Sequence, residues 1–188
     1  MQVPAIETAR LRLRAHTPAD LPACAEMWAD EGVTRYIGIK PSTLQETWSR
    51  MLRYAGLWAF LGYGYWAIEE LASREFIGEL GFADFKRDGI AALARVPELG
   101  WALASRVHGN GYATEAVGAV LSWADAHLDE PRTACLISAD NVRSVRVAEK
   151  SGYRKIEELP YAGTTALIFE RLRKGGRVSS YQPPGELP

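Results

Sequence analysis

Arg106-Val107-His108-Gly109-Asn110-Gly111-Tyr112-Ala113-Thr114-Glu115 is the stretch that decides how this chain folds. It lies between 98–103, which has the pattern of a strand, and 113–128, which has the pattern of a helix. A helix N-terminus presents N–H groups without intrahelical partners and carries a partial positive charge. Gly109 and Gly111 allow the backbone to curl and to approach a ligand closely. The stretch therefore predicts a site for an anionic, phosphate-bearing ligand.

The composition predicts an ordinary globular protein. The chain has 188 residues, of which 47% are hydrophobic and 24% charged, enough for one domain with a sizeable core. A net charge of -1 gives no general attraction to nucleic acid or to an anionic membrane, so we expect neither partner. Cys24 and Cys135 fall in apolar patterns and are expected to be buried, and the three His residues predict no metal-ligand cluster. Without a signal peptide or a membrane-spanning apolar run, the expected location is cytoplasmic.

Helix and strand signals alternate along the chain. In order, we expect a strand over 10–14, a helix from Thr17 to about Trp28, a helix over 41–58, strands over 65–69, 76–83 and 98–103, a helix over 113–128, a strand over 133–138, a helix over 141–151 and a strand over 164–171. The three central strands have hairpin-like spacing and predict an antiparallel meander. The helix after the third of them permits the next strand to be parallel.

Other local signals set the boundaries. Ser42 or Thr43 is expected to cap the helix over 41–58, with Glu46 reaching back. The strict alternation over 10–14 places its leucines in the core and its arginines on a solvent face. Residues 1–173 are predicted to form a single domain, and 174–188, rich in Gly, Pro and Ser, a flexible tail.

Four segments together resemble the GNAT acetyltransferase superfamily. They are 7–14, 76–82, 98–116 and 141–153, and the resemblance spans 7–172. Within the superfamily, the chain is most similar to the Rim-like branch, the ribosomal-protein alanine N-acetyltransferases. The resemblance implies an α/β (α+β) GNAT fold, with a central mixed, mostly antiparallel sheet that splays between its fourth and fifth strands and has helices on both faces. The glycine spacing of a Rossmann turn and the Gly-Lys-Ser/Thr of a Walker turn are both missing from the turn.

The resemblance also implies which ligand the turn holds, the pyrophosphate of acetyl-coenzyme A, which acts as the acetyl donor. The groups expected to face it are the backbone N–H groups of Val107, Gly109, Asn110, Gly111 and Ala113 and the hydroxyl of Thr114. Arg106 and His108 either assist a phosphate or lie in solvent. Asn141 would hydrogen-bond the pantetheine arm while it caps its helix. Lys150 either meets the ribose phosphate or ends a solvated helix.

The implied reaction is the attack of an amine on a thioester. The thioester oxygen needs a hydrogen-bond donor, which we expect to be a backbone N–H near Ala102 or Leu103. The ammonium must lose a proton, and Glu98 or a chain of waters is the expected base. Many superfamily members place a proton-donating tyrosine where this chain has Ala148. Ser144 is the expected acid instead, although a thiol pKa of about 8.5 makes an acid dispensable.

We therefore predict an N-acetyltransferase that transfers acetyl to a primary amine by direct attack in a ternary complex, with a protein N-terminus as one acceptor. Two alternatives stay open: a small-molecule amine as acceptor, such as an amino acid or an antibiotic, and a non-catalytic acyl-coenzyme A sensor. The acceptor site is expected between the first two helices and the late hairpin, near aromatic residues that comprise Trp28, Tyr36, Trp48, Trp58, Tyr63 and Tyr65. A monomer and a homodimer are both compatible with the sequence.

Overall fold

The computed structural model describes residues 3–37 and 40–173, so the tail predicted over 174–188 lies outside the described residues. The strands are β1 (Ile6–Glu7), β2 (Leu11–Arg14), β3 (Tyr65–Glu70), β4 (Phe76–Ala83), β5 (Glu98–Leu103), β6 (Arg132–Ser138), β7 (Arg154–Tyr161) and β8 (Thr164–Leu172). The α-helices are α1 (Leu21–Ala29), α2 (Glu31–Thr34), α3 (Leu44–Leu61), α4 (Tyr112–His127) and α5 (Val142–Lys150). Short 3₁₀ turns occupy Pro18–Asp20, Ala91–Leu93 and Ser105–Val107.

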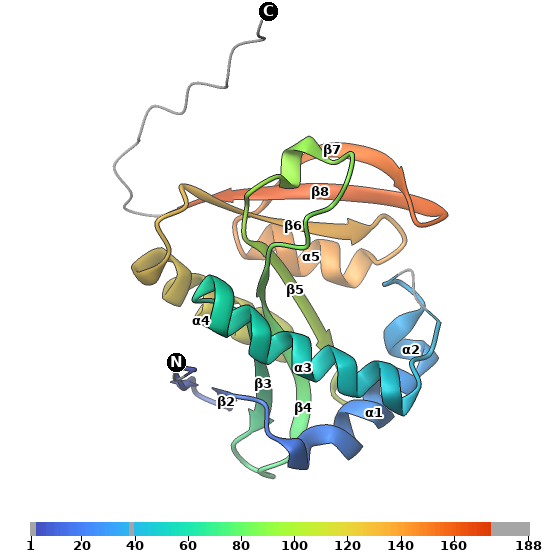
Figure 1. Ribbon diagram of the computed structural model, residues 1–188, viewed down its shortest axis with the longest axis vertical. Coiled ribbons are helices and arrows are strands. Elements are labelled where there is room, and N and C mark those ends of the chain that lie inside the picture. Colours follow the sequence, from blue (N-terminus) through green and yellow to red (C-terminus); the bar gives the residue numbers. More distant parts are fainter. Residues whose placement is uncertain (1–2, 38–39, 174–188) are drawn as a thin grey trace, which may run out of the picture.

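The strands form one sheet in the order β1-β2-β3-β4-β5-β6-β8-β7 (Figure 1). Every neighbouring pair is antiparallel except β5 and β6, which run parallel because α4 returns the chain between them. These two strands pair at only one position, Glu98 with Ala134, and then separate. The structure thus confirms a mixed, mostly antiparallel sheet that splays between the predicted fourth and fifth strands.

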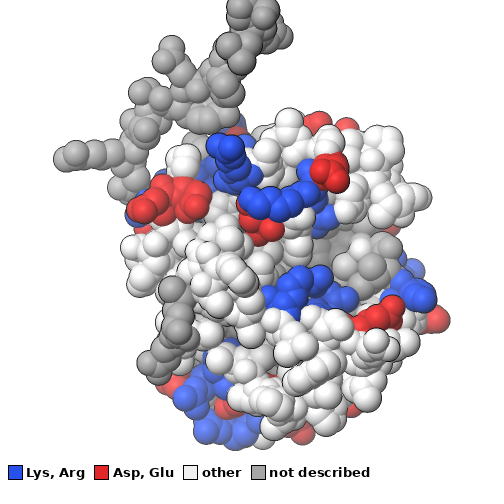
Figure 2. All heavy atoms as spheres, in the orientation of Figure 1, with Lys and Arg blue, Asp and Glu red and all other residues white. Residues whose placement is uncertain are grey.

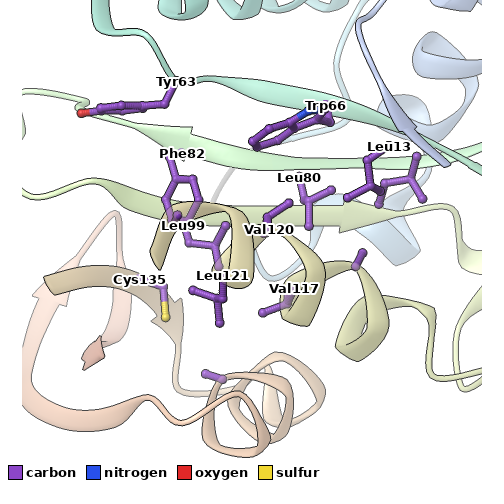
Figure 3. Close-up of a cluster of buried hydrophobic side chains, with 14 of the residues drawn as sticks. Leu13, Tyr63, Trp66, Leu80, Phe82, Leu99, Val117, Val120, Leu121 and Cys135 are labelled. Carbon is purple, nitrogen blue, oxygen red and sulfur yellow. The ribbon is translucent and has the colours of Figure 1, made fainter. Parts of the chain in front are cut away.

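Helices cover both faces of the sheet. Successive side chains of β4 point to opposite faces, and their contacts show which helices lie on each face. Glu79 contacts Trp28 of α1 and Tyr54 of α3. Its neighbour Leu80 points to the other face, into the cluster formed with Val117 and the rest of the α4 stripe (Figure 3). Figure 1 shows α3 in front of β3 and β4 and α4 behind them. The larger core therefore lies between the sheet and α4, and a second one lies under α1 and α3.

Several helix boundaries follow the predicted signals. The capping box at the start of α3 is confirmed: the Glu46 N–H donates to Thr43 Oγ1 at 3.2 Å, and Thr43 N–H donates to Glu46 Oε2 at 2.7 Å. α3 continues three residues beyond the predicted end and stops where Gly62 adopts a left-handed φ of 75°. The predicted burial of Cys24 and Cys135 is confirmed. In the described part of the chain, no helix has both the length and the apolar character needed to cross a membrane.

Two strands and one α-helix were not predicted: β1, β7 and α2. β1 and α2 span two and four residues, too few to show a period. β7 lies at the edge of the sheet and exposes most of its side chains, so its charged sequence lacks the apolar alternation of a half-buried strand. The late hairpin is therefore formed by β7 and β8, of which the sequence pattern located only the second strand, over 164–171.

Candidate active site

The turn before α4 has the backbone conformation that its glycines predict. Gly109 and Gly111 have φ values of +85° and +81°, in the left-handed region that disfavours residues with a Cβ. Gly111 is the N-cap residue of α4 and has no side chain with which to cap the helix. The first-turn N–H groups of α4 therefore point to a surface that suits an anion.

The β1–β2 connection braces this turn. The Glu115 carboxylate, in the first turn of α4, accepts hydrogen bonds from Thr8 Oγ1 at 2.6 Å and from Arg10 Nε at 2.7 Å. Arg10 also donates to the Asn110 carbonyl at 2.9 Å and stacks over the Tyr112 ring. Burial opposes ionisation of Glu115, but these hydrogen bonds outweigh it and lower its pKa. The brace connects residues a hundred positions apart, and the sequence analysis missed it.

The structure gives protein partners to two side chains whose role the sequence left open. Arg106 Nη2 donates to Glu75 Oε2 and to the Phe76 carbonyl, both at 3.0 Å. His108 Nε2 lies 2.8 Å from the Leu103 carbonyl. Both side chains thus hold the turn against the ends of β4 and β5. Lys150 is exposed at the last residue of α5.

A cavity of about 420 Å³ opens where β5 and β6 separate, and it brings together four of the predicted catalytic and cofactor-binding residues. Glu98 and Ala102 line it from β5, and Asn141 and Ser144 line it from the start of α5. Asn141 Oδ1 accepts a hydrogen bond from the Ser144 N–H at 3.1 Å, so the predicted helix cap is confirmed. Leu103, by contrast, is buried in the core and does not line the cavity. Chemical groups from both sides of the splay therefore meet in one space.

Glu98 is buried and bound by a residue that the sequence analysis did not single out. Arg87 donates to both carboxylate oxygens, from Nε to Oε2 and from Nη2 to Oε1, each at 2.7 Å. Its third nitrogen donates to the Tyr161 hydroxyl of β7. Burial lowers the Arg87 pKa, but the hydrogen bonds and charge of Glu98 outweigh it and raise the pKa above its usual value. The pair fixes Glu98 at the wall of the cavity.

A second buried carboxylate, Glu79, faces the same cavity and was also missed. It lies in register with Ala102, on the strand next to it. Glu79 Oε1 accepts hydrogen bonds from Trp28 Nε1 at 3.1 Å and from the Tyr54 hydroxyl. Oε2 has no hydrogen bond within the described residues, and His16 Nε2 lies 3.5 Å from it. The available signal was a single acidic residue inside an otherwise apolar strand.

His16, Cys24 and Glu79 correct the expectation that no metal-ligating side chains cluster. One ligand atom of each lies within 4.8 Å of the others. Burial and the charges of Glu79 and Asp20 raise the Cys24 pKa, so the residue is a thiol at neutral pH rather than the thiolate that metals prefer. The sequence missed the group because its members come from three separate parts of the chain, the connection after β2, α1 and β4.

The predicted aromatic residues divide between cavity and core. Trp28, Tyr36 and Tyr65 line the cavity. Trp58 and Tyr63 belong to the hydrophobic core, and Trp48 lies outside the cavity with 38% of its surface exposed. Gly100 makes room for Tyr65, because a Cβ at this position of β5 would overlap the tyrosine hydroxyl.

Known proteins share this architecture. The family model for the acetyltransferase (GNAT) domain matches residues 10–154. YoaA of Bacillus subtilis, an uncharacterised N-acetyltransferase, is 29% identical over 153 residues, which are 81% of this chain and 84% of YoaA. The structure of a GnaT-family acetyltransferase from Bordetella pertussis superposes with a TM-score of 0.80 at 29% identity and covers 90% of this chain and 99% of the other.

A more distant structure shows the same fold. RimL, a ribosomal L7/L12 α-N-protein acetyltransferase solved in complex with coenzyme A, superposes with a TM-score of 0.74. The match covers 92% of this chain and all of RimL. At 18% identity, the similarity extends to the fold and leaves the acceptor of this chain undetermined.

Proposed function

This chain belongs to the GNAT family of acetyltransferases, and we propose that it transfers the acetyl group of acetyl-coenzyme A to a primary amine. One observation carries the proposal: β5, which lines a cavity where it separates from β6, leads through a short turn into a helix start without a side-chain cap. Such a helix start suits a pyrophosphate, and strand edges that no longer pair suit the amides of a pantetheine arm. The chain therefore offers partners for both ends of the donor.

We assign the donor contacts as follows. The pyrophosphate binds to the backbone N–H groups of the turn, from Val107 to Ala113, and to the Thr114 hydroxyl. The Asn141 side chain donates a hydrogen bond from Nδ2 to the pantetheine arm, since its Oδ1 already caps α5. Lys150 meets the ribose phosphate. Arg106 and His108 act by holding the turn, because their side chains already bind β4 and β5.

The donor supplies an acetyl group activated as a thioester, and the remaining chemistry falls to the chain. A backbone N–H near Ala102 or Leu103 stabilises the negative charge that develops on the thioester oxygen. Glu98 takes the proton from the attacking ammonium, and Arg87 keeps this carboxylate oriented. The Ser144 hydroxyl donates a proton to the departing sulfur and recovers one from the nitrogen of the tetrahedral intermediate, which becomes the amide. Most of the rate enhancement comes from holding the two substrates side by side.

A turnover assay tests this proposal. The protein is mixed with acetyl-coenzyme A and a panel of N-terminal peptides and small amines, amino acids and aminoglycosides among them. Free thiol is followed over time, and mass spectrometry identifies the acetylated product. We expect thiol release to depend on at least one amine and to match the acetylated product one to one. Tight coenzyme A binding without thiol release on any amine would instead identify a non-catalytic acyl-coenzyme A-binding protein.

A further inference from the structure

Two arginines of α3 line the cavity and take no part in the mechanism above. Arg50 and Arg53 are three positions apart, so they emerge from the same side of the helix. Figure 2 shows basic side chains on both sides of a hollow on this face of the molecule. α3 thus adds two positive charges to a cavity whose carboxylates come from the sheet.

Neither arginine has an anionic partner among the residues that the structure describes. Arg50 lies over the Trp28 ring, with Cζ 3.7 Å from the ring centroid, and its Nε is buried without a hydrogen bond. Arg53 lies 5.9 Å from the Tyr54 centroid and 6.0 Å from that of Phe85. The aromatic faces orient both guanidinium groups. They accept no hydrogen bond from the N–H groups that lie in the guanidinium plane. Their donors are therefore available to a ligand.

The nearby carboxylates are bound elsewhere. Glu46, one turn before Arg50 on α3, turns to the helix cap and accepts from Thr43. Glu98 is held by Arg87, and one oxygen of Glu79 accepts two hydrogen bonds. A guanidinium that is partly shielded from water gains most from a carboxylate or a phosphate, which matches its fork with two parallel hydrogen bonds.

We propose that Arg50 and Arg53 bind an oxyanion, a carboxylate or a phosphate, carried by the acceptor amine. The inference rests on the proposed acetyl transfer and names the class of acceptor. The sheet wall of the cavity offers carboxylates to the ammonium end, and the α3 wall offers arginines to the anionic end. A polyamine, which carries only positive charge, is disfavoured because it meets two arginines.

Matched pairs of acceptors test this specificity and separate the sources of the oxyanion. Alanine is compared with alaninamide, phosphoethanolamine with ethanolamine, and a C-terminally amidated Ala-Asp peptide with the Ala-Asn peptide, and spermidine serves as the polycation. We expect kcat/KM to be at least about tenfold higher for the oxyanion member of at least one pair. Equal values within all three pairs would overturn the inference while leaving the acetyltransferase function intact.

Variants then assign the effect to α3. Arg53→Gln is the main test, since its side chain is exposed and its loss leaves the core intact, and Arg50→Gln is the second. Each should raise KM for the preferred acceptor about tenfold or more, with kcat and KM for acetyl-coenzyme A little changed. Arg53→Lys should restore part of the loss. The control is Lys155→Gln, which removes an exposed charge outside the cavity and should change none of these constants.

The outcomes distinguish this inference from the function on which it rests. If the α3 variants keep the KM of the wild type for an oxyanion acceptor, the inference is wrong and the function stands. If no amine of any charge supports thiol release, the proposed function fails and takes the inference with it. Thermal unfolding of each variant verifies that a change in KM comes from a folded protein.

Discussion

The two buried carboxylates of the cavity share a face of the sheet but differ in what binds them. Glu98 has both oxygens in a fork with Arg87, whereas Glu79 keeps one oxygen without a hydrogen bond. A carboxylate that acts as the base must be ionised and must reach the ammonium of the acceptor, directly or through one water. Arg87 occupies a lone pair on each oxygen of Glu98, so the geometry makes Glu79 the natural comparison.

Glu98→Gln keeps the shape of the side chain and removes its basicity. If Glu98 is the base, kcat should fall about a hundredfold, because a positioned base contributes about 10²–10⁴ to the rate. The affinity for coenzyme A, measured by calorimetry, should stay the same. Glu79→Gln is the matched variant, since it changes a buried carboxylate on the neighbouring strand. An unchanged pH–rate profile in Glu98→Gln would favour a chain of waters, and a larger loss in Glu79→Gln would assign the base to Glu79.

For single residues, the sequence pointed to side chains within the four segments that resemble the GNAT superfamily. It missed the partners that these side chains have in distant parts of the chain. The position of Asn141 and Ser144 at the cavity could be predicted because both belong to one short helix start. Tyr161 bonds to Arg87 across 74 positions, and Tyr54 bonds to Glu79 across 25. Such pairs are set by how strands and helices pack, and no local period or spacing encodes them.

Among the elements, the turn before α4 was the most predictable, because its shape depends on two glycines and the helix that follows. The left-handed φ of Gly109 and Gly111 is a local requirement that the sequence states directly. The brace from Arg10 to Glu115 depends on the tertiary fold and was invisible. β7 was missed for the opposite reason: an exposed edge strand has no apolar face to reveal it.

Gly111→Val tests the turn as a binding element. A β-branched residue at φ +81° is strained by about 1–3 kcal/mol, and its side chain would keep a pyrophosphate away from the N–H groups. We expect the Kd for coenzyme A to rise at least tenfold in a calorimetric titration. Gly118→Ala is the control, because Gly118 lies inside α4 with open space around its Cβ position. This change should stabilise the protein by about 0.5–1 kcal/mol and leave the Kd unchanged. Equal affinity in both variants would contradict the assignment of the turn.

For the whole molecule, the order of most helices and strands could be predicted from the sequence. The ion pairs and hydrogen bonds that connect them could not. The alternation over 10–14 placed its arginines in solvent, yet Arg14 is partly buried in an ionic network. It donates to both oxygens of Asp20 at 2.8 Å and to Glu69 of β3, also at 2.8 Å. The network fastens the start of the helical layer to two strands. A period of two shows which residues share a face of a strand. It does not show whether a polar side chain on that face contacts solvent or a buried carboxylate.

This network predicts how the stability of the fold depends on pH. Burial opposes ionisation of Asp20, but hydrogen bonds from Arg14 and Thr17 outweigh it and lower its pKa below that of an unfolded aspartate, about 3.9. The folded state therefore binds fewer protons than the unfolded state just below this pH. The Asp20 contribution is fully present above about pH 5 and is lost as the pH falls through the folded-state pKa.

Urea unfolding of the wild type and of Asp20→Asn, from pH 7 down to pH 3, measures this contribution. At pH 7 the variant should lose about 3 kcal/mol of unfolding free energy, because the partly buried Arg14 guanidinium loses one of its two carboxylate partners. As the pH falls below about 4 the two curves should begin to approach each other, and the difference should keep shrinking toward the folded-state pKa of Asp20, since protonation removes the same charge from the wild type. Lys155→Gln, which breaks an exposed pair, should change the unfolding free energy by less than about 1 kcal/mol at every pH. Parallel curves for the wild type and Asp20→Asn would mean that Asp20 titrates alike in the folded and unfolded chains, and that the network fastens the fold by packing alone.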